Sequence, residues 1–282
     1  REDAMPSKIN QAKFVREFVT LAEEKGWRYN IIEAFDQPWK RISEGAVGGF
    51  WGLFDKDRLD KNVFTGDVSN FPNYKYLGFG SLLLIFGFSF LLKNSNISTK
   101  RVVLFSFINT IFAVLYMLQM EQFNITVRSS GEVVWATLVL LTHLAIYYFV
   151  LLNIVKESKP KIVGIREILT NKIFNVDTLP MILFYSSFIF VLISTIILAF
   201  EGRYRNFEIY IFAISAISFV LLYGGRFVNM KFKAFEKLSF IVLLITSIIS
   251  FYNEGSLNIF SNIWIIIALI FTYILFQGSK NN

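Results

Sequence analysis

A carboxylate pair, an aromatic ring and an ammonium group occur close together in "YNIIEAFDQPWK", residues 29–40. Glu33 ends a short apolar run, and Asp36, Trp39 and Lys40 follow within the length of one loop. A tryptophan face can stack on the apolar side of a pyranose ring, while carboxylate and ammonium groups hydrogen-bond to its hydroxyls. These residue types at this spacing therefore indicate a sugar-binding subsite formed by all four residues.

Two other interpretations of the same residues remain open. Glu33 follows an apolar run, and a buried carboxylate needs a partner, which Lys40 or Arg41 supplies in a purely structural salt bridge. Glu33 and Asp36 could alternatively form a retaining glycosidase pair, which needs carboxyls about 5–5.5 Å apart. Strand residues three apart point to opposite faces, so we disfavour the second alternative.

Two elements precede this loop and would position it. Residues 6–26 have the pattern of an amphipathic helix, with Ser7 as its N-cap and Gly26 as its stop. One stripe of that helix is expected to be buried: Gln11, Phe14, Val15, Phe18, Val19 and Ala22. "WRYNIIEAF" then predicts a strand that is apolar on both faces, as parallel strands covered by helices are.

A helix followed by a buried parallel strand is one step of an α/β repeat and is not a domain by itself. We therefore expect residues 1–70 to be the last helix and the last strand of a larger domain that is truncated here, such as a (β/α)₈ TIM barrel. In such barrels the active-site groups lie at the C-terminal ends of strands, where Glu33 is found. The glycine-rich "GAVGGF" beginning at Gly45 lacks phosphate-loop spacing and predicts a tight turn.

Three stretches carry a resemblance to a known family: "INQAKFVREFV", "YNIIEAFDQPWK" and "EGAVGGFWGLFD". They resemble the C-terminal end of the glycoside hydrolase family 17 barrel, above all its bacterial membrane-bound β-1,3-glucanase and transglycosylase group, which is associated with β-glucan synthesis. The resemblance covers residues 1 to about 70. It implies a periplasmic barrel that acts on β-1,3-glucan with two glutamates and retains anomeric configuration.

The resemblance also implies that both catalytic residues are missing from this chain. The family's nucleophile lies in a motif E-x-G-W-P-S after the seventh strand, and its acid/base glutamate lies on the fourth strand; neither motif is present. Both are expected upstream of Arg1, so residues 1–282 alone are expected to be inactive. Glu33 then has a subsite role, and we predict no cofactor.

Composition places the remainder of the chain in a membrane. Of the 282 residues 54% are hydrophobic, and the mean hydropathy is +0.51. Residues 71–282 carry a net charge of +8 and residues 1–70 a net charge of −1. The basic excess lies between apolar segments, which argues against nucleic-acid binding. The chain has no cysteine and only one histidine, His143, so we expect no metal site.

Seven apolar stretches predict a seven-helix transmembrane domain over residues 71–282, because a bilayer core of roughly 30 Å needs about 20 helical residues. The stretches are 76–92, 102–120, 133–155, 180–200, 207–223, 238–252 and 259–277. The sixth is short and spans only if its helix extends through Phe235 or the bilayer thins. Between the third and fourth stretches, residues 162–173 predict a short amphipathic helix on the inner leaflet, with a solvated loop as the alternative.

Basic residues in the connecting loops predict the orientation. Thirteen Lys and Arg lie on the side of the C-terminus and four on the side of residues 1–70. The positive-inside rule then places the N-terminal segment in the periplasm or outside the cell and the C-terminus in the cytoplasm. We expect a multi-pass protein of the cell (inner) membrane, with the lipid bilayer, β-glucan and a glucan synthase or exporter as partners.

Polar residues inside the predicted spans are candidates for a different function. Asn109, Gln119, His143 and Asn153 lie within apolar stretches, and Glu208 lies near the outer end of the fifth. We expect Asn109 and His143 to make interhelical hydrogen bonds. The alternative hypothesis is that the bundle itself works as a glycan exporter, a synthase partner or a seven-helix sensor.

Overall fold

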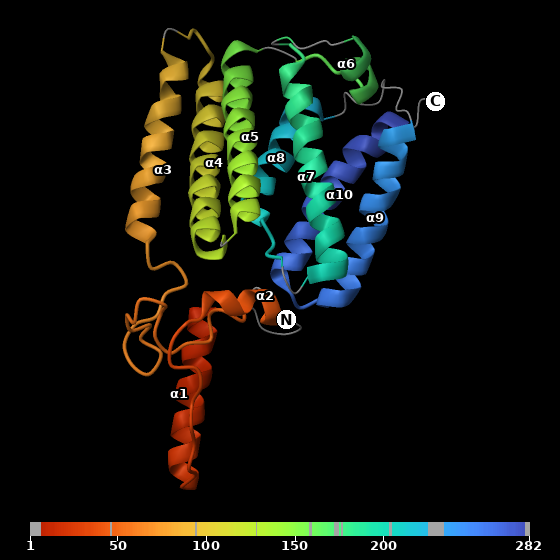
Figure 1. The fold of residues 1–282 in the computed structure, drawn as a ribbon. Coiled ribbons are helices and arrows are strands. Elements are labelled where there is room, and N and C mark those ends of the chain that lie inside the picture. The colour runs from red at the N-terminus through yellow and green to blue at the C-terminus, as the bar shows by residue number, and fades with distance from the viewer. Residues whose placement is uncertain are drawn as a thin grey trace.

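A computed structural model of the chain describes residues 7–45, 47–93, 95–127, 129–157, 160–171, 175, 177–202, 205–224 and 234–279, with side chains through residue 274. The chain forms a bundle of long helices with a small N-terminal segment at one end (Figure 1). The helical elements are α1 (Lys8–Lys25), η1 (Pro38–Lys40), α2 (Arg41–Glu44), α3 (Tyr74–Ser89), η2 (Phe90–Leu92), α4 (Thr99–Thr126), α5 (Ser130–Lys156), α6 (Ile165–Asn171), α7 (Leu179–Glu201), α8 (Ile209–Tyr223), α9 (Ala234–Glu254) and α10 (Ile259–Ser279).

The predicted N-terminal helix is confirmed, together with both of its ends. The Ser7 hydroxyl accepts a hydrogen bond from the Asn10 amide, and Gly26 closes the helix in the left-handed region at φ 65°. The buried side of α1 consists of Ala12, Val15 and Ala22. Phe14, expected in the buried stripe, is exposed instead.

The predicted strand at residues 27–35 is wrong. Among the described residues there is no strand, and Phe35 takes part only in an isolated parallel bridge with Phe54. A parallel strand needs neighbouring strands to form a ladder, and residues 1–70 contain no other run that provides one. Ile32, predicted to be buried, is therefore 78% exposed. The described part of the chain shows no TIM barrel.

Each of the seven predicted apolar stretches forms a helix, and five of them are long and apolar enough to cross a membrane: α3 with η2, α4, α5, α7 and α9. The helix α8 and the part of α10 whose side chains the structure describes, Ile259–Ile274, are shorter. At 1.5 Å per residue the 15 residues of α8 span about 22 Å, less than a bilayer core. The predicted extension of the sixth stretch through Phe235 is confirmed, since α9 begins at Ala234.

The buried face of α9 carries many polar residues and its exposed face is apolar, which is the reverse of a helix in a water-soluble protein. Its buried face carries small polar residues: Ser239, Thr246, Ser247 and Ser250. Its exposed face carries large apolar ones: Leu238, Ile241, Ile245 and Ile248. Small residues let helices approach closely in lipid, and an apolar exterior suits contact with acyl chains. These are features of a helical membrane protein.

The helices alternate in direction, so α3 begins at the N-terminal segment and the C-terminus lies at the opposite end (Figure 1). The edge helix α3 packs mainly on α4, and α5, α7 and α8 occupy the centre. The short helix α6 lies within the predicted amphipathic segment and buries Ile168, which confirms that a helix forms there. Some loop residues used to predict orientation lie outside the described residues: Arg128, Lys159, Lys172, Arg203, Arg226, Lys231, Lys233 and Lys280.

Candidate functional site

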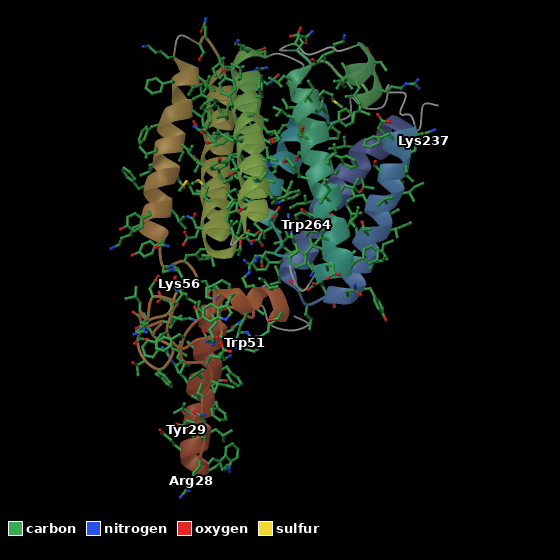
Figure 2. The ribbon with its side chains drawn as sticks, in the orientation of Figure 1. Arg28, Tyr29, Trp51, Lys56, Lys237 and Trp264 are labelled. Carbon is green, nitrogen blue, oxygen red and sulfur yellow. The ribbon has the colours of Figure 1, made fainter. Side chains whose placement is uncertain are left out.

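The predicted sugar-binding residues lie where the N-terminal segment meets the bundle. Tyr29 is at the distal tip of α1 and Trp51 is close to the helices (Figure 2). From Tyr29 the chain therefore returns along α1 toward the bundle. The side chain of Gln11 on α1 then donates to the backbone carbonyls of Trp51 and Gly52, at 3.0 Å each.

Backbone hydrogen bonds hold residues 33–37 against residues 49–54. The amide of Leu53 donates to the carbonyl of Glu33 and the amide of Asp36 to the carbonyl of Phe54, at 2.9 and 3.0 Å. The amide of Gln37 donates to the carbonyl of Gly49 at 3.0 Å. The predicted turn in the glycine-rich stretch is confirmed, and it brings the two segments together.

Gly52 is required at the closest point of that contact. A Cβ atom placed on Gly52 would lie 2.1 Å from the backbone nitrogen of Asp36 and 2.6 Å from the carbonyl oxygen of Phe54. Both are backbone atoms, so neither can rotate away. The absence of a side chain at this position allows the two segments to pair.

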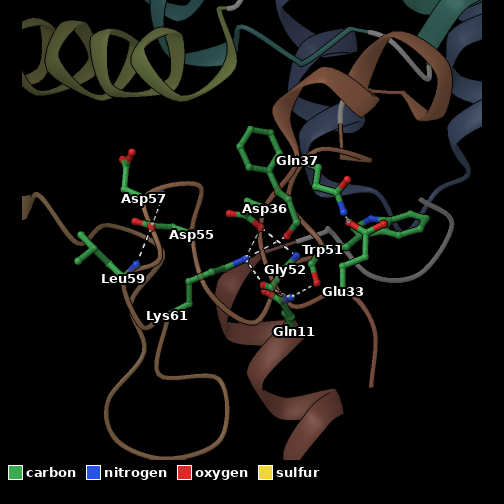
Figure 3. A network of polar contacts seen from close by, with 11 residues as sticks. Gln11, Glu33, Asp36, Gln37, Trp51, Gly52, Asp55, Asp57, Leu59 and Lys61 are labelled. Carbon is green, nitrogen blue, oxygen red and sulfur yellow. Dashed lines mark hydrogen bonds and ion pairs between the residues drawn. The ribbon is translucent and has the colours of Figure 1, made fainter. Parts of the chain in front are cut away.

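Asp36 forms a buried ion pair with Lys61 (Figure 3). The Lys61 ammonium donates to Asp36 Oδ1 at 3.0 Å and to the carbonyls of Gly52 and Phe50 at 2.7 and 3.1 Å. The Gly52 amide donates to the same carboxylate oxygen at 2.9 Å. Burial raises the pKa of Asp36 and lowers the pKa of Lys61, because both charged forms lose contact with water. The pair therefore joins the two ends of the loop between residues 36 and 61.

Glu33 forms a second, more accessible cluster. Its carboxylate accepts from the Gln37 side-chain amide at 2.9 Å and from the ammonium group of Lys40. Lys40 also lies 3.7 Å from Glu44. The hydrogen bond that Lys40 donates to Glu33 raises the pKa of Lys40. Carboxylate, amide and ammonium groups thus lie close together in one turn, and the salt bridge offered as the purely structural alternative for Glu33 is formed with Lys40.

Trp39 projects from the short helical turn Pro38–Lys40 and is 67% exposed. An exposed indole of this kind offers a flat apolar face to a ligand. The structure therefore brings Glu33 and Lys40 together, places Trp39 beside them in the chain and directs Asp36 into a separate buried pair. The role of each in sugar binding stays a prediction.

Three residues of the site were not predicted from the sequence: Gln37, Gly52 and Lys61. Gln37 lies four residues after Glu33, and this spacing within a turn was the available signal. Lys61 is 25 residues from Asp36, in a segment without any regular pattern, so no sequence signal points to it.

Two of the polar residues singled out in the sequence, Asn109 and His143, contact neighbouring helices. Asn109 on α4 donates to the carbonyl of Ile85 on α3 at 3.0 Å and accepts from the hydroxyl of Tyr147 on α5. His143 on α5 lies 3.4 Å from the hydroxyl of Ser187 on α7. Both predicted interhelical contacts are confirmed.

The other polar residues singled out in the sequence are also bonded. Gln119 accepts from the Ile211 amide at 3.4 Å, whereas Asn153 donates to the Phe149 carbonyl within its own helix at 2.8 Å. Glu208 is buried and pairs with Arg205 at 2.8 Å. The Gln119 contact links α4 with α8, whereas the Asn153 contact stays within α5 and the Arg205–Glu208 pair lies just before α8.

Comparison with known proteins adds no assignment to these observations. No model of a protein family matches the chain, and no curated protein or solved structure matches it either.

Proposed function

We propose that residues 1–282 are the C-terminal part of a membrane-anchored, extracytoplasmic glycosidase or transglycosylase that acts on β-1,3-glucan. In this proposal Glu33, Asp36, Trp39 and Lys40 belong to a sugar subsite, directly or, for Asp36, by holding the loop. The two catalytic glutamates would lie in a preceding barrel, in accordance with the resemblance to glycoside hydrolase family 17. The bundle would have seven spans, with residues 1–70 outside and the C-terminus in the cytoplasm.

The observation that carries the proposal is the cluster of Glu33, Gln37 and Lys40 next to the exposed indole of Trp39. Carbohydrate sites combine a flat apolar surface with several hydrogen-bonding groups at its edge. Here the polar groups come from one turn, and the loop is held by the buried Asp36–Lys61 pair. The stability of the loop therefore does not depend only on the groups of the proposed sugar subsite.

Binding of laminari-oligosaccharides to the chain reconstituted in lipid nanodiscs tests the proposal. We expect calorimetry to detect binding by the native chain and a loss of at least tenfold in affinity for Glu33→Gln, which keeps the shape of the side chain but removes its charge. Glu17→Gln, at an exposed site on α1, is the matched control and should bind normally. Absence of binding by the native chain, or equal binding by Glu33→Gln, would contradict the proposal.

The alternative hypothesis assigns the function to the bundle, as an exporter, a synthase partner or a sensor. Asn109 and His143, which could line a path, instead bond to neighbouring helices. This observation favours a structural role for the polar residues of the bundle. Cysteine substitutions at Asn109, His143 and Asn153 that react with a water-soluble thiol reagent would support the alternative.

A further inference from the structure

The N-terminal segment is attached to the bundle at the turn between α4 and α5. The guanidinium of Arg41 donates to the carbonyl of Thr126, the last residue of α4, and lies 3.4 Å from the carboxylate of Glu132 in the first turn of α5. Arg41 is the first residue of α2, so these contacts hold α2 at the level where α4 ends and α5 begins.

Two apolar residues close to Arg41 in the chain are uncovered. Ile42 is 87% exposed, and Trp39, three residues before it, is also exposed. Residues three apart share one face of a helical turn, so the two side chains form a small apolar face. Lys40 and Glu44 pair with each other away from it, four residues apart.

Exposed apolar side chains occur at the same level on the other helices. In Figure 1 α2 runs across the bundle axis at the height of the lower ends of α7, α9 and α10. At that end, Leu257 in the connection between α9 and α10 and Ile259 at the start of α10 are 66% and 65% exposed. Tyr74 and Tyr76 at the start of α3 are exposed as well, as the aromatic residues of a membrane interface are.

We propose that α2 and the turn before it lie in the interfacial layer of the bilayer, with Ile42 in contact with lipid and the Trp39 indole at the boundary between lipid and water, where one of its two faces stays open to a sugar. Arg41 holds the turn at the ends of the spanning helices, and the apolar face of the turn meets the lipid that surrounds them. Tryptophan and aliphatic side chains next to cationic groups are typical of such interfacial segments. The inference does not depend on sugar binding.

A consequence for the ligand follows if both proposals hold. Glu33 and Lys40 would lie within one helical turn of the lipid headgroups, since Lys40 immediately precedes Arg41. Such a subsite would receive a glycan held at the membrane surface more readily than one free in solution.

The chain has no cysteine, so single-cysteine spin labelling tests the inference directly. We would label Ile42→Cys in phosphatidylcholine vesicles and compare collisions with oxygen, which partitions into lipid, with those of a water-soluble nickel chelate. Arg28→Cys at the distal tip of α1 is the aqueous control, and Leu257→Cys is the lipid-exposed control. We expect Ile42 to resemble Leu257, with oxygen collisions several-fold above those at Arg28.

A label at Ile42 that meets the nickel chelate as freely as one at Arg28 would overturn the inference. A label shielded from both reagents would show that protein covers Ile42, and it would overturn the inference too. As a second measurement, brominated phosphatidylcholine should quench the native fluorescence more strongly than that of Trp39→Phe. Equal fractional quenching would also count against lipid contact.

Discussion

The buried pair between Asp36 and Lys61 allows a quantitative prediction about the loop that carries the candidate site. Replacement of Lys61 by methionine keeps an unbranched side chain of similar length but removes the charge and three hydrogen bonds. Removing one partner of a buried ion pair typically costs about 3–5 kcal/mol. Only 4% of the Lys61 side chain and 8% of the Asp36 side chain are exposed, so solvent screening reduces this cost little.

We expect the lower end of that range for Lys61→Met. The pKa of Asp36 is already raised by burial, so the unpaired carboxyl takes up a proton more easily and avoids part of the penalty. A loss of about 3 kcal/mol corresponds to roughly a hundredfold increase in the population of the open loop, at about 1.4 kcal/mol per factor of ten.

Hydrogen exchange measured by mass spectrometry on the reconstituted protein gives the required readout. The amides of Gly52, Leu53 and Phe54 are bonded to residues 33–37 or to the Asp36 carboxylate, and they should exchange about a hundredfold faster in Lys61→Met. Peptides from α4 and α5 should be unchanged. These peptides serve as the internal reference.

Lys56→Met is the matched control, because Lys56 pairs with Asp57 at 2.5 Å on the surface, where both side chains are more than half exposed. Exposed pairs contribute about 0–1 kcal/mol, so exchange at Gly52 should change by less than about fivefold. If Lys61→Met and Lys56→Met give the same exchange at Gly52, the Asp36–Lys61 pair does not hold the loop and the reasoning is refuted.

Four further predictions concern the loop and the bundle. Gly52→Ala should open the loop to limited proteolysis, because its methyl group would lie 2.1 Å from the Asp36 nitrogen; an intact loop would contradict the proposed close contact. Because burial raises the pKa of Asp36 above 3.8, the folded loop binds its proton more tightly than the unfolded chain, so denaturation midpoints should fall as pH rises from 3.8 through the raised pKa, and Asp36→Asn should abolish this fall. Ser129→Ala removes the capping box of α5 and should lower stability by about 1 kcal/mol in thermal unfolding, with an unchanged midpoint as the opposing result. Tyr147→Phe removes the hydroxyl bonded to Asn109 and should cost about 0.6–2 kcal/mol in the same assay, whereas no change would assign that bond no net role.

Local sequence signals predicted the helical elements well. Ser7 and Gly26 marked both ends of α1, because an N-cap hydroxyl and a left-handed glycine act within one turn of the helix. The extension of α9 through Phe235 followed from the length that a bilayer requires. Glu33 pairs with Lys40, which lies seven residues later in the same loop, so the local spacing indicated this pairing.

Contacts between distant residues were beyond the reach of such signals. The strand at 27–35 was predicted from its apolar composition, but a strand exists only where neighbours complete its hydrogen bonds, and composition does not supply these. Lys61 meets Asp36 across 25 residues, and Arg41 meets the Thr126 carbonyl across 85. Neither pair shows any periodicity that a reader of the sequence could use.

The N-terminal segment is attached to the bundle at two separate points in addition to the chain itself. Arg41 bonds to the end of α4, and Asn73, just before α3, donates to the Glu121 carboxylate of α4 at 2.6 Å. Between them, Arg16 on α1 donates to the carbonyls of Asn62 and Gly66 at 2.8 and 2.7 Å, which joins the intervening loop to α1.

One attachment would leave the segment free to swivel about a single connection, whereas two attachments joined through α1 remove that rotation. The segment therefore keeps a fixed orientation relative to the helical bundle. Any domain that packs on the exposed side of this segment would be held in the same orientation relative to the bundle.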